Sequence, residues 1–195
     1  MMNEECNSWA HDDPLMLDYH DTRWCRPVHD DNELFAMLCL EGQQAGLSWS
    51  TIVKKEAAFR LAFDNYDISR VAHYDEHTIE KLMNNTAIVR NRRKIESAIH
   101  NARVIEDMLT MGKYSTFDEY MWHFTDGARI VNRWTEFSQI PAKSKLSEAV
   151  SKDMKKYGFT FVGPVIMYSY LQGIGVIDDH LDGCPCKLNE KFSRK

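Results

Sequence analysis

The sequence predicts an all-α protein. Apolar residues recur at the three- and four-residue spacing of amphipathic helices over most of the 195 residues, and no segment shows the strict alternation of a half-buried strand. Cap residues, glycines and prolines interrupt this pattern where helices would begin and end. No internal repeat or low-complexity linker divides the chain. We therefore expect a single domain over residues 1–195, with room for two helical lobes.

The expected helices follow one another through short loops. The pair Asp13-Pro14 combines an N-cap with a first-turn proline, and Ser48 is a second good cap. The run 116–119 matches a capping box, and Gly158 suits a helix end. On these signals the helices cover about residues 14–20, 31–43, 48–63, 75–84, 95–109, 116 onward, 146–157 and 165–174.

Residues 158–164 read as a tight hairpin between the last two helices. Gly163 permits an unusual backbone angle, and Pro164 fits the first turn of the following helix. A hairpin that leads into a helix N-terminus presents free backbone amides, which bind phosphate without side-chain charge. The lysines at 152, 155 and 156 add positive charge nearby. A plain helix–helix turn is the alternative that the pattern alone allows.

Composition narrows the class of protein. A hydrophobic content of 44% and an aromatic content of 11% support a packed core rather than disorder. No apolar run reaches the roughly 18 residues of a membrane span, and the first residues lack a signal-peptide pattern. We expect a soluble, cytoplasmic monomer. Five cysteines are few for a disulfide scaffold, so reduced thiols, some of them metal-bound, fit better.

The net charge of −5 argues against a nucleic-acid partner unless positive charge is concentrated locally. The segment 90–94 (Arg-Asn-Arg-Arg-Lys) is one such concentration, at the start of an expected helix. Cations there face the unfavourable end of the helix dipole, so they suggest an outside anion. A solvated charged turn is the alternative.

Possible metal ligands lie at both ends of the chain. Cys6 and His20 are near the start, and His180 and Cys184 are near the end. Imidazole nitrogen and thiolate sulfur are the ligands of a closed, tetrahedral structural zinc site, and four ligands fill it. Convergence of the four would tie the two ends together. Because the spacing is not a standard zinc-finger pattern, two buried thiols and two ordinary histidines remain possible. The ligand types alone also allow a metal-dependent hydrolase, which would keep one coordination position open.

A carboxylate among aromatic residues is the second unusual feature. Glu41 shares a helical face with Leu34 and Leu38 near a helix C-terminus, where both burial and the dipole disfavour its charge. Either it has a partner or it reaches solvent past the helix end. Aromatic walls with one carboxylate would suit a flat cationic ring, although ordinary core packing also explains such residues. The neighbouring candidates for the walls are Trp9, Met16, Tyr19, Trp24 and Trp49.

The segment 40–49, Leu-Glu-Gly-Gln-Gln-Ala-Gly-Leu-Ser-Trp, closely resembles the signature of the DNA-3-methyladenine glycosylase I family. Residues 12–24, the hairpin 158–163 and the pair Asp179-His180 are similar to further motifs of that family, in the same order. The resemblance covers residues 6–186. It implies a helix-hairpin-helix DNA glycosylase fold with a structural zinc joining the terminal segments. The implied ligands are Cys6, His20, His180 and Cys184, and Cys186 is a nearby thiol that could be confused with Cys184.

The resemblance also implies roles and a reaction. Glu41 would accept hydrogen bonds from the adenine edge, Tyr19 and Trp49 would stack on the base, and Trp9 and Trp24 would line the pocket. Phe161, Val162 and Gly163 would hold the backbone of double-stranded alkylated DNA. The enzyme would flip 3-methyladenine out of the duplex and hydrolyse its N-glycosidic bond. No Schiff-base lysine is suggested, so the products would be free 3-methyladenine and an abasic site.

Several positions depart from the family pattern. They are one extra residue between Cys6 and Trp9, Met16 in place of a pocket tyrosine, Cys25, Ala87 and Arg93 at positions where glycines are common, and Asp178 in place of asparagine. One hypothesis gives Asp178 a catalytic role, stabilising positive charge on the sugar; the alternative is that it supports His180. The change at Met16 and the acidic balance favour a second reading, a non-catalytic zinc-containing paralogue that binds DNA or a nucleobase.

Overall fold

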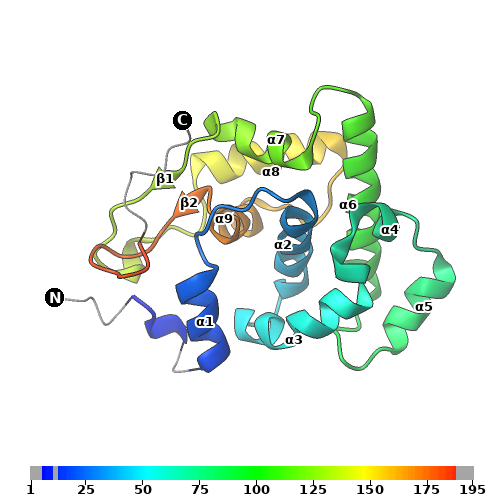
Figure 1. The fold of residues 1–195 in the computed structure, drawn as a ribbon, viewed down its shortest axis with the longest axis horizontal. Coiled ribbons are helices and arrows are strands. Elements are labelled where there is room, and N and C mark those ends of the chain that lie inside the picture. The colour runs from blue at the N-terminus through cyan, green and yellow to red at the C-terminus, as the bar shows by residue number, and fades with distance from the viewer. Residues whose placement is uncertain (1–5, 11–12, 188–195) are drawn as a thin grey trace.

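The computed structural model describes residues 6–10 and 13–187, and in this part of the chain it confirms the all-α class (Figure 1). The expected domain 1–195 therefore extends beyond the described residues at both ends. Residue 12, which begins the family motif 12–24, also lies outside them. None of the described helices is long and apolar enough to cross a membrane.

Nine α-helices form the described part of the molecule, and eight of them match the expected ones within a few residues. The ninth, α4, has five residues, too few to show a helical period in the sequence. The helices are α1 (Pro14–Thr22), α2 (Asp31–Gln44), α3 (Trp49–Ala62), α4 (Ile68–Ala72), α5 (Glu76–Asn84), α6 (Arg92–Thr110), α7 (Phe117–Trp122), α8 (Lys145–Tyr157) and α9 (Pro164–Gly173). Single 3₁₀ turns lie at Ser8–Ala10, Asp64–Tyr66, His123–Thr125 and Phe137–Gln139.

Side-chain caps begin most of these helices. Asp13 accepts a hydrogen bond from the backbone of α1, and Ser48 accepts one from the backbone of α3, as expected. The capping box of α7 is incomplete, because the Glu119 carboxylate accepts from the backbone of Ser115 instead of the N-cap residue. Asp31, from α2, binds two first-turn amides of α7 in its place. A local signal therefore found the helix, and a distant side chain completed its cap.

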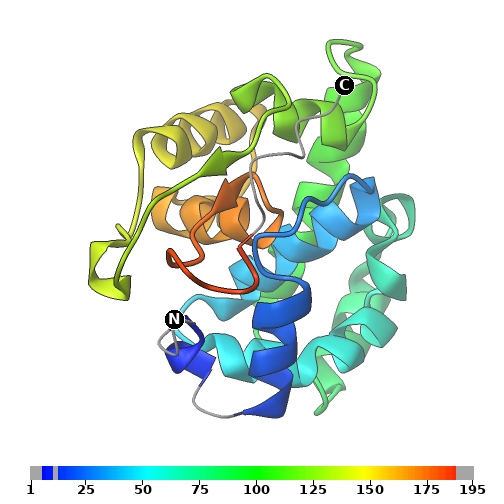
Figure 2. The ribbon, with the colours of Figure 1, turned by 60° about the vertical axis from the view of Figure 1, so that its left-hand side comes forward.

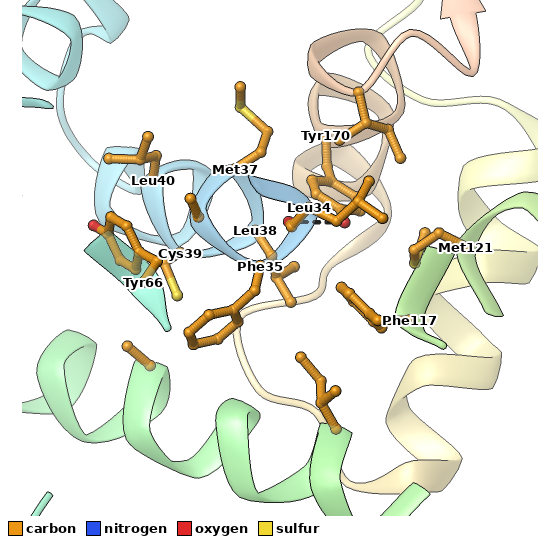
Figure 3. Packing of buried hydrophobic residues seen from close by; sticks show 14 of the residues in the cluster. Leu34, Phe35, Met37, Leu38, Cys39, Leu40, Tyr66, Phe117, Met121 and Tyr170 are labelled. Atoms are coloured by element: carbon orange, nitrogen blue, oxygen red, sulfur yellow. Dashed lines mark hydrogen bonds between the residues drawn. The ribbon is translucent and has the colours of Figure 1, made fainter. Parts of the chain in front are cut away.

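Helix α2 runs through the core and packs against α9 (Figures 1 and 3). Leu34 and Phe35 are fully buried, and the Tyr170 hydroxyl of α9 donates a 3.0 Å hydrogen bond to the Leu34 carbonyl (Figure 3). Gly173 lies so close to α2 that an added Cβ would stand 2.9 Å from the sulfur of Met37. Glu41 follows Met37 by one helical turn, so this tight packing fixes where its carboxylate lies.

Residues 158–163 join α8 to α9 where the hairpin is expected, and the source of their backbone freedom differs from the expectation. Gly163 has an ordinary φ of −63°, and the left-handed conformation falls on Phe161, with φ +55°. The expectation that Gly163 supplies an unusual angle is therefore wrong. Asn101 of α6 holds the hairpin: its Nδ2 donates to the Thr160 carbonyl (3.0 Å), and its Oδ1 accepts from the Thr160 amide (2.9 Å). A buried side chain thus replaces the strand pairing that a β-hairpin would use.

Two short strands, β1 (Ile130–Val131) and β2 (Ile177–Asp178), form a parallel pair that the sequence did not indicate. Two residues are too few for a visible alternation, and the pairing joins positions far apart in the chain. Before β2, Gly175 has φ +74°, and an added Cβ would lie 2.2 Å from the backbone of Arg26. Only glycine fits there. After α9, β2 leads into the C-terminal segment that lies near α1 (Figure 2).

Candidate active site

A cavity of about 410 Å³ opens among α1, α2, α3 and α9. All of the expected wall residues except Met16 line it, and so does Glu41. The lining comprises Trp9, Tyr19, Trp24, Glu41, Gln44, Trp49, Phe137, Ile140, Ser169 and Gln172. The volume and the largely aromatic walls are those of a pocket for one flat ring.

The aromatic walls come from four separate segments, the last of which contributes Phe137. The rings of Tyr19 on α1 and Trp49 on α3 have centroids 5.4 Å apart. Trp9 meets Trp24 edge-on at 5.5 Å, so the extra residue after Cys6 does not remove Trp9 from the cavity. Such tilted contacts leave ring faces available for a stacked ligand.

Glu41 is the acidic group of the cavity. Its side chain is 3% exposed, and no described residue gives its carboxylate a hydrogen bond. Burial raises the pKa of Glu41 from its ordinary value of 4.5 to about 8. The pKa of Tyr19 is also raised, first by burial and then by the charge of Glu41. A cationic ring in this cavity would favour the ionised carboxylate and supply the partner that the protein does not.

The basic segment 90–94 contributes to the site from inside the molecule. The Lys94 ammonium, 8% exposed, donates to the carbonyls of Gln43 (2.7 Å) and Ala45 (2.6 Å) and so caps the C-terminal end of α2. Arg92 forms ion pairs with glutamates of α5 and α6. The expectation of an outside anion is wrong for these two residues, because protein groups already satisfy them. The other two arginines of the segment are exposed.

Three of the four expected metal ligands converge beside the cavity, and the fourth, His180, packs its ring against that of His20. Donor atoms of Cys6, His20 and Cys184 lie within 4.8 Å of one another, with Cys6 Sγ 3.4 Å from His20 Nε2. The structure joins Cys6 and Cys184 by a disulfide, which differs from the expectation of reduced, partly metal-bound thiols. Cys186 faces Asp21 instead, at 3.4 Å, so the structure brings Cys184 and not Cys186 to this cluster.

The two histidines of the cluster are oriented by carboxylates. His20 Nδ1 lies 2.7 Å from Asp21, and His180 Nδ1 lies 2.8 Å from Asp178. His20 Nε2 lies toward the sulfur atoms of Cys6 and Cys184, and the rings of His20 and His180 have centroids 5.0 Å apart. The Nε2 atom of His180 is buried and has no partner among the described residues. Trp24 contacts both rings, so one residue forms a wall of the cavity and of the cluster.

Asp178 does not reach the cavity, and this disagrees with the hypothesis that it is catalytic. Its side chain is fully buried, and one carboxylate oxygen binds the amide and the Nδ1 of His180. The other oxygen accepts a 3.0 Å hydrogen bond from Arg129. A carboxylate enclosed in this way orients His180 and has no access to a sugar in the cavity.

Two further expectations are modified. Met16 is buried on α1 but does not line the cavity, so it acts as a core residue. In the hairpin, Phe161 and Gly163 are partly exposed, whereas the Val162 side chain belongs to the core and its carbonyl accepts from Ser151 Oγ at 2.6 Å. Val162 is therefore a core residue, and the partly exposed neighbours are the ones that an outside molecule can reach.

Sequence reasoning gave no role to five residues of the lining. Ser169 and Gln172 are one turn apart on α9. Gln44 follows Glu41 within the signature segment. Phe137 and Ile140 come from the irregular segment after β1, and no local pattern indicates that this segment folds over the cavity.

Comparisons with known proteins identify the family of this chain. A family model described as methyladenine glycosylase matches residues 9–187. The chain is 42% identical over 188 residues to DNA-3-methyladenine glycosylase 1 of Escherichia coli, which covers 96% of this chain and 99% of the relative. It is 38% identical over 181 residues to DNA-3-methyladenine glycosylase of Haemophilus influenzae, covering 93% and 97%.

Solved structures show the same likeness. A 3-methyladenine DNA glycosylase I in which a tyrosine is replaced by phenylalanine, in complex with 3-methyladenine, superposes with a TM-score of 0.91 at 34% identity. The alignment covers 95% of this chain and 98% of that one. With a family match over nearly its whole length and relatives of this similarity, the chain belongs to the methyladenine glycosylase family.

Proposed function

We propose that this protein removes 3-methyladenine from alkylated double-stranded DNA by hydrolysing the N-glycosidic bond. The observation that carries the proposal is the buried, unpartnered Glu41 carboxylate in an aromatic cavity sized for one base. A 3-methylated adenine in DNA is cationic, so it provides both the charge that this carboxylate lacks and a ring for the aromatic walls.

The chemistry requires little from the protein beyond binding and orientation. The damaged nucleotide leaves the stack, which costs a few kcal/mol and least for a base that pairs poorly. Glu41 accepts hydrogen bonds from the exocyclic amine, while Tyr19 and Trp49 hold the ring. Water attacks the sugar C1′, the C1′–N9 bond breaks, and its electron pair neutralises the departing base. The described cavity lining contains no lysine, so the proposed product is an abasic site.

We further propose a structural zinc held by Cys6, His20, His180 and Cys184. The donor set fits this ion, since two carboxylates on Nδ1 leave both histidine Nε2 atoms for a metal, and the His180 Nε2 atom is otherwise an orphaned buried group. In the reduced protein the two cysteine thiolates would complete a set of four protein ligands, which is the set of a structural rather than a catalytic zinc. This ion would hold the terminal segments together and support Trp24.

We also propose that the hairpin and the start of α9 bind the DNA backbone. Gly163 gives α9 no side-chain cap, and Pro164 has no amide hydrogen. The amides of Val165 and Ile166 have no carbonyl acceptor one turn earlier, and Val165 is 53% exposed. Lys152 and Lys155 are exposed on the preceding helix. This arrangement supports a phosphate contact despite the acidic net charge.

The substitution Gly163→Ala tests that contact. The fold does not need glycine here, since φ is −63° and no atom lies within 4 Å of an added Cβ. We expect an unchanged melting temperature and unchanged affinity for free 3-methyladenine. The affinity for duplex DNA should fall about tenfold, since the methyl group obstructs close approach of a phosphate. Fluorescence anisotropy at several salt concentrations measures it; undiminished DNA affinity would place the interface elsewhere.

Release of free base from methylated duplex DNA tests the function as a whole. The expected result is 3-methyladenine in the supernatant and abasic sites that alkali converts to strand breaks. Unmethylated DNA of the same sequence is the control. If no base is released while 3-methyladenine or DNA still binds, the protein is a binding paralogue, the reading that Met16 and the acidic charge first suggested.

A further inference from the structure

A second polar side chain of the cavity has its orientation fixed from behind. Gln172, on the last turn of α9, is 9% exposed and lines the cavity. Its Nε2 donates a 2.7 Å hydrogen bond to Oδ2 of Asp179. Its backbone carbonyl accepts from the amide of Cys25, which further restrains this turn. The side chain is therefore held at both its base and its tip.

The Asp179 carboxylate determines which end of the Gln172 carboxamide points toward it. Its side chain is fully buried, and Oδ1 accepts from Asn132 Nδ2 (2.6 Å) and from Trp134 Nε1 (2.7 Å), while Tyr168 donates to Oδ2 at 2.6 Å. An indole N–H can only donate, so this carboxylate serves as an acceptor. If the Gln172 carboxamide were rotated by half a turn, its Oε1 would face Asp179 Oδ2, and the two oxygens would repel each other. The amide nitrogen must face Asp179, and Oε1 must face away from it.

The Oε1 atom of Gln172 is thus left for a ligand. No described residue donates a hydrogen bond to it, yet it is not among the enclosed polar atoms without a partner, unlike Oε1 of Gln43. It is accessible from the cavity. Together with Glu41, it gives the aromatic cavity two oxygen acceptors, one of which cannot rotate into a donor.

A fixed acceptor distinguishes damaged from normal adenine at one position of the ring. Neutral adenine has a lone pair on N3, which a nearby oxygen repels. In 3-methyladenine a methyl group replaces that lone pair, and its polarised C–H bonds attract an oxygen weakly. Within DNA, N9 carries the sugar in both bases, and N1, N7 and the amine offer the same acceptors and donors, so an acceptor contributes to selection chiefly when it faces N3.

We propose that Gln172 is a specificity-determining residue whose Oε1 faces the N3 edge of the bound base. This rests on the proposed function and adds a second contact to that of Glu41. Glu41 responds to the charge of the base, whereas Gln172 responds to the site of methylation. The orientation imposed by Asp179 is what prevents the carboxamide from offering its N–H to the N3 lone pair of normal adenine.

The variant Gln172→Met removes the acceptor and nearly keeps the volume. Affinities for free 3-methyladenine and adenine are measured by calorimetry and, for the weaker ligand, by NMR titration. We expect the preference for 3-methyladenine over adenine to fall about three- to tenfold, the size of one neutral polar contact. The matched control is Gln43→Met, a buried glutamine outside the cavity, which should leave the ratio unchanged. Equal weakening of both ligands by Gln172→Met would mean packing only and would overturn the proposal.

A ligand series on the unaltered protein keeps the test independent of that variant's folding. In 3-deazaadenine a C–H replaces N3, so the lone pair is absent without methylation. At a pH where both free bases are neutral, the protein should bind 3-deazaadenine about three- to tenfold more tightly than adenine. Equal affinities would contradict the contact with N3 while leaving the function intact. Failure to bind 3-methyladenine at all would instead remove the proposed function, and this inference with it.

Discussion

Replacing Glu41 by Gln is expected to lower kcat/KM for 3-methyladenine release about 100-fold or more. The variant keeps the shape of the side chain but loses the negative charge that pairs with a cationic base in a site shielded from water. Because the charge of the base is present in the bound substrate and disappears on release, kcat/KM should fall much more than the affinity for the neutral product. Single-turnover assays on methylated duplex, with product affinity by calorimetry, separate the two effects.

Stability provides the control for this variant. The folded-state pKa of Glu41, about 8, lies above its ordinary value of 4.5, so the folded protein binds the extra proton between these values. The contribution of Glu41 to stability is therefore greatest below pH 4.5 and is lost as pH rises toward 8. Glutamine does not titrate. The stability of Glu41→Gln relative to the unaltered protein should increase from pH 5 to pH 9, on the order of a few kcal/mol. A variant that is inactive and also less stable at pH 9 would indicate misfolding.

Trp49→Ala tests a different part of the same cavity and helps to interpret the glutamate variant. It removes a stacking surface without changing charge, so it should weaken binding of both substrate and product. Uniform loss from this variant, beside the charge-selective loss from Glu41→Gln, would distinguish ring binding from electrostatic recognition. Similar profiles for the two would argue against a charge-specific role of Glu41.

Removal of the proposed zinc is expected to have the largest effect on stability. Protein purified under reducing conditions should contain one zinc per chain by elemental analysis, and chelation should lower the melting temperature by about 10 °C or more. The reason is that the ion would join segments 164 residues apart, from His20 to Cys184, beside a small apolar cluster around Leu181. The cavity should weaken with it, because Trp24 contacts both histidines.

Two serine variants make the zinc test specific. Cys184→Ser should lose the metal, whereas Cys186→Ser, two residues away and turned toward Asp21, should retain it. If Cys186→Ser loses the zinc and Cys184→Ser retains it, Cys186 is the ligand in place of Cys184. A metal-free protein with a persistent bond between Cys6 and Cys184 under reducing conditions would replace the zinc with the disulfide as the link between the terminal segments. Thiol titration distinguishes these states directly.

The positions of the helices could be predicted because their signals are local. Apolar spacing, the Asp13 and Ser48 caps and the Pro164 start depend only on neighbouring residues, and each of the eight expected helices formed within a few residues of its predicted position. The conformation of the loops could not be predicted from neighbouring residues in this way. Three consecutive non-glycine residues, Asp64 to Tyr66, adopt positive φ, although nothing in their sequence indicates it. The Tyr74 hydroxyl on Asp64 and the stacking of Tyr66 on Phe63 accompany this turn.

The candidate site divides in the same way. The sequence by itself determined the helical class, and through its motifs the carboxylate, the aromatic walls and the four cysteine and histidine donors. Only the tertiary structure decided that Lys94 caps α2 from within, that Asp178 supports His180 away from the cavity, and that Gln172 faces it in one orientation. The physical reason is that side-chain identity is a local property, whereas burial, hydrogen-bond partner and orientation depend on residues that meet only after the chain has folded.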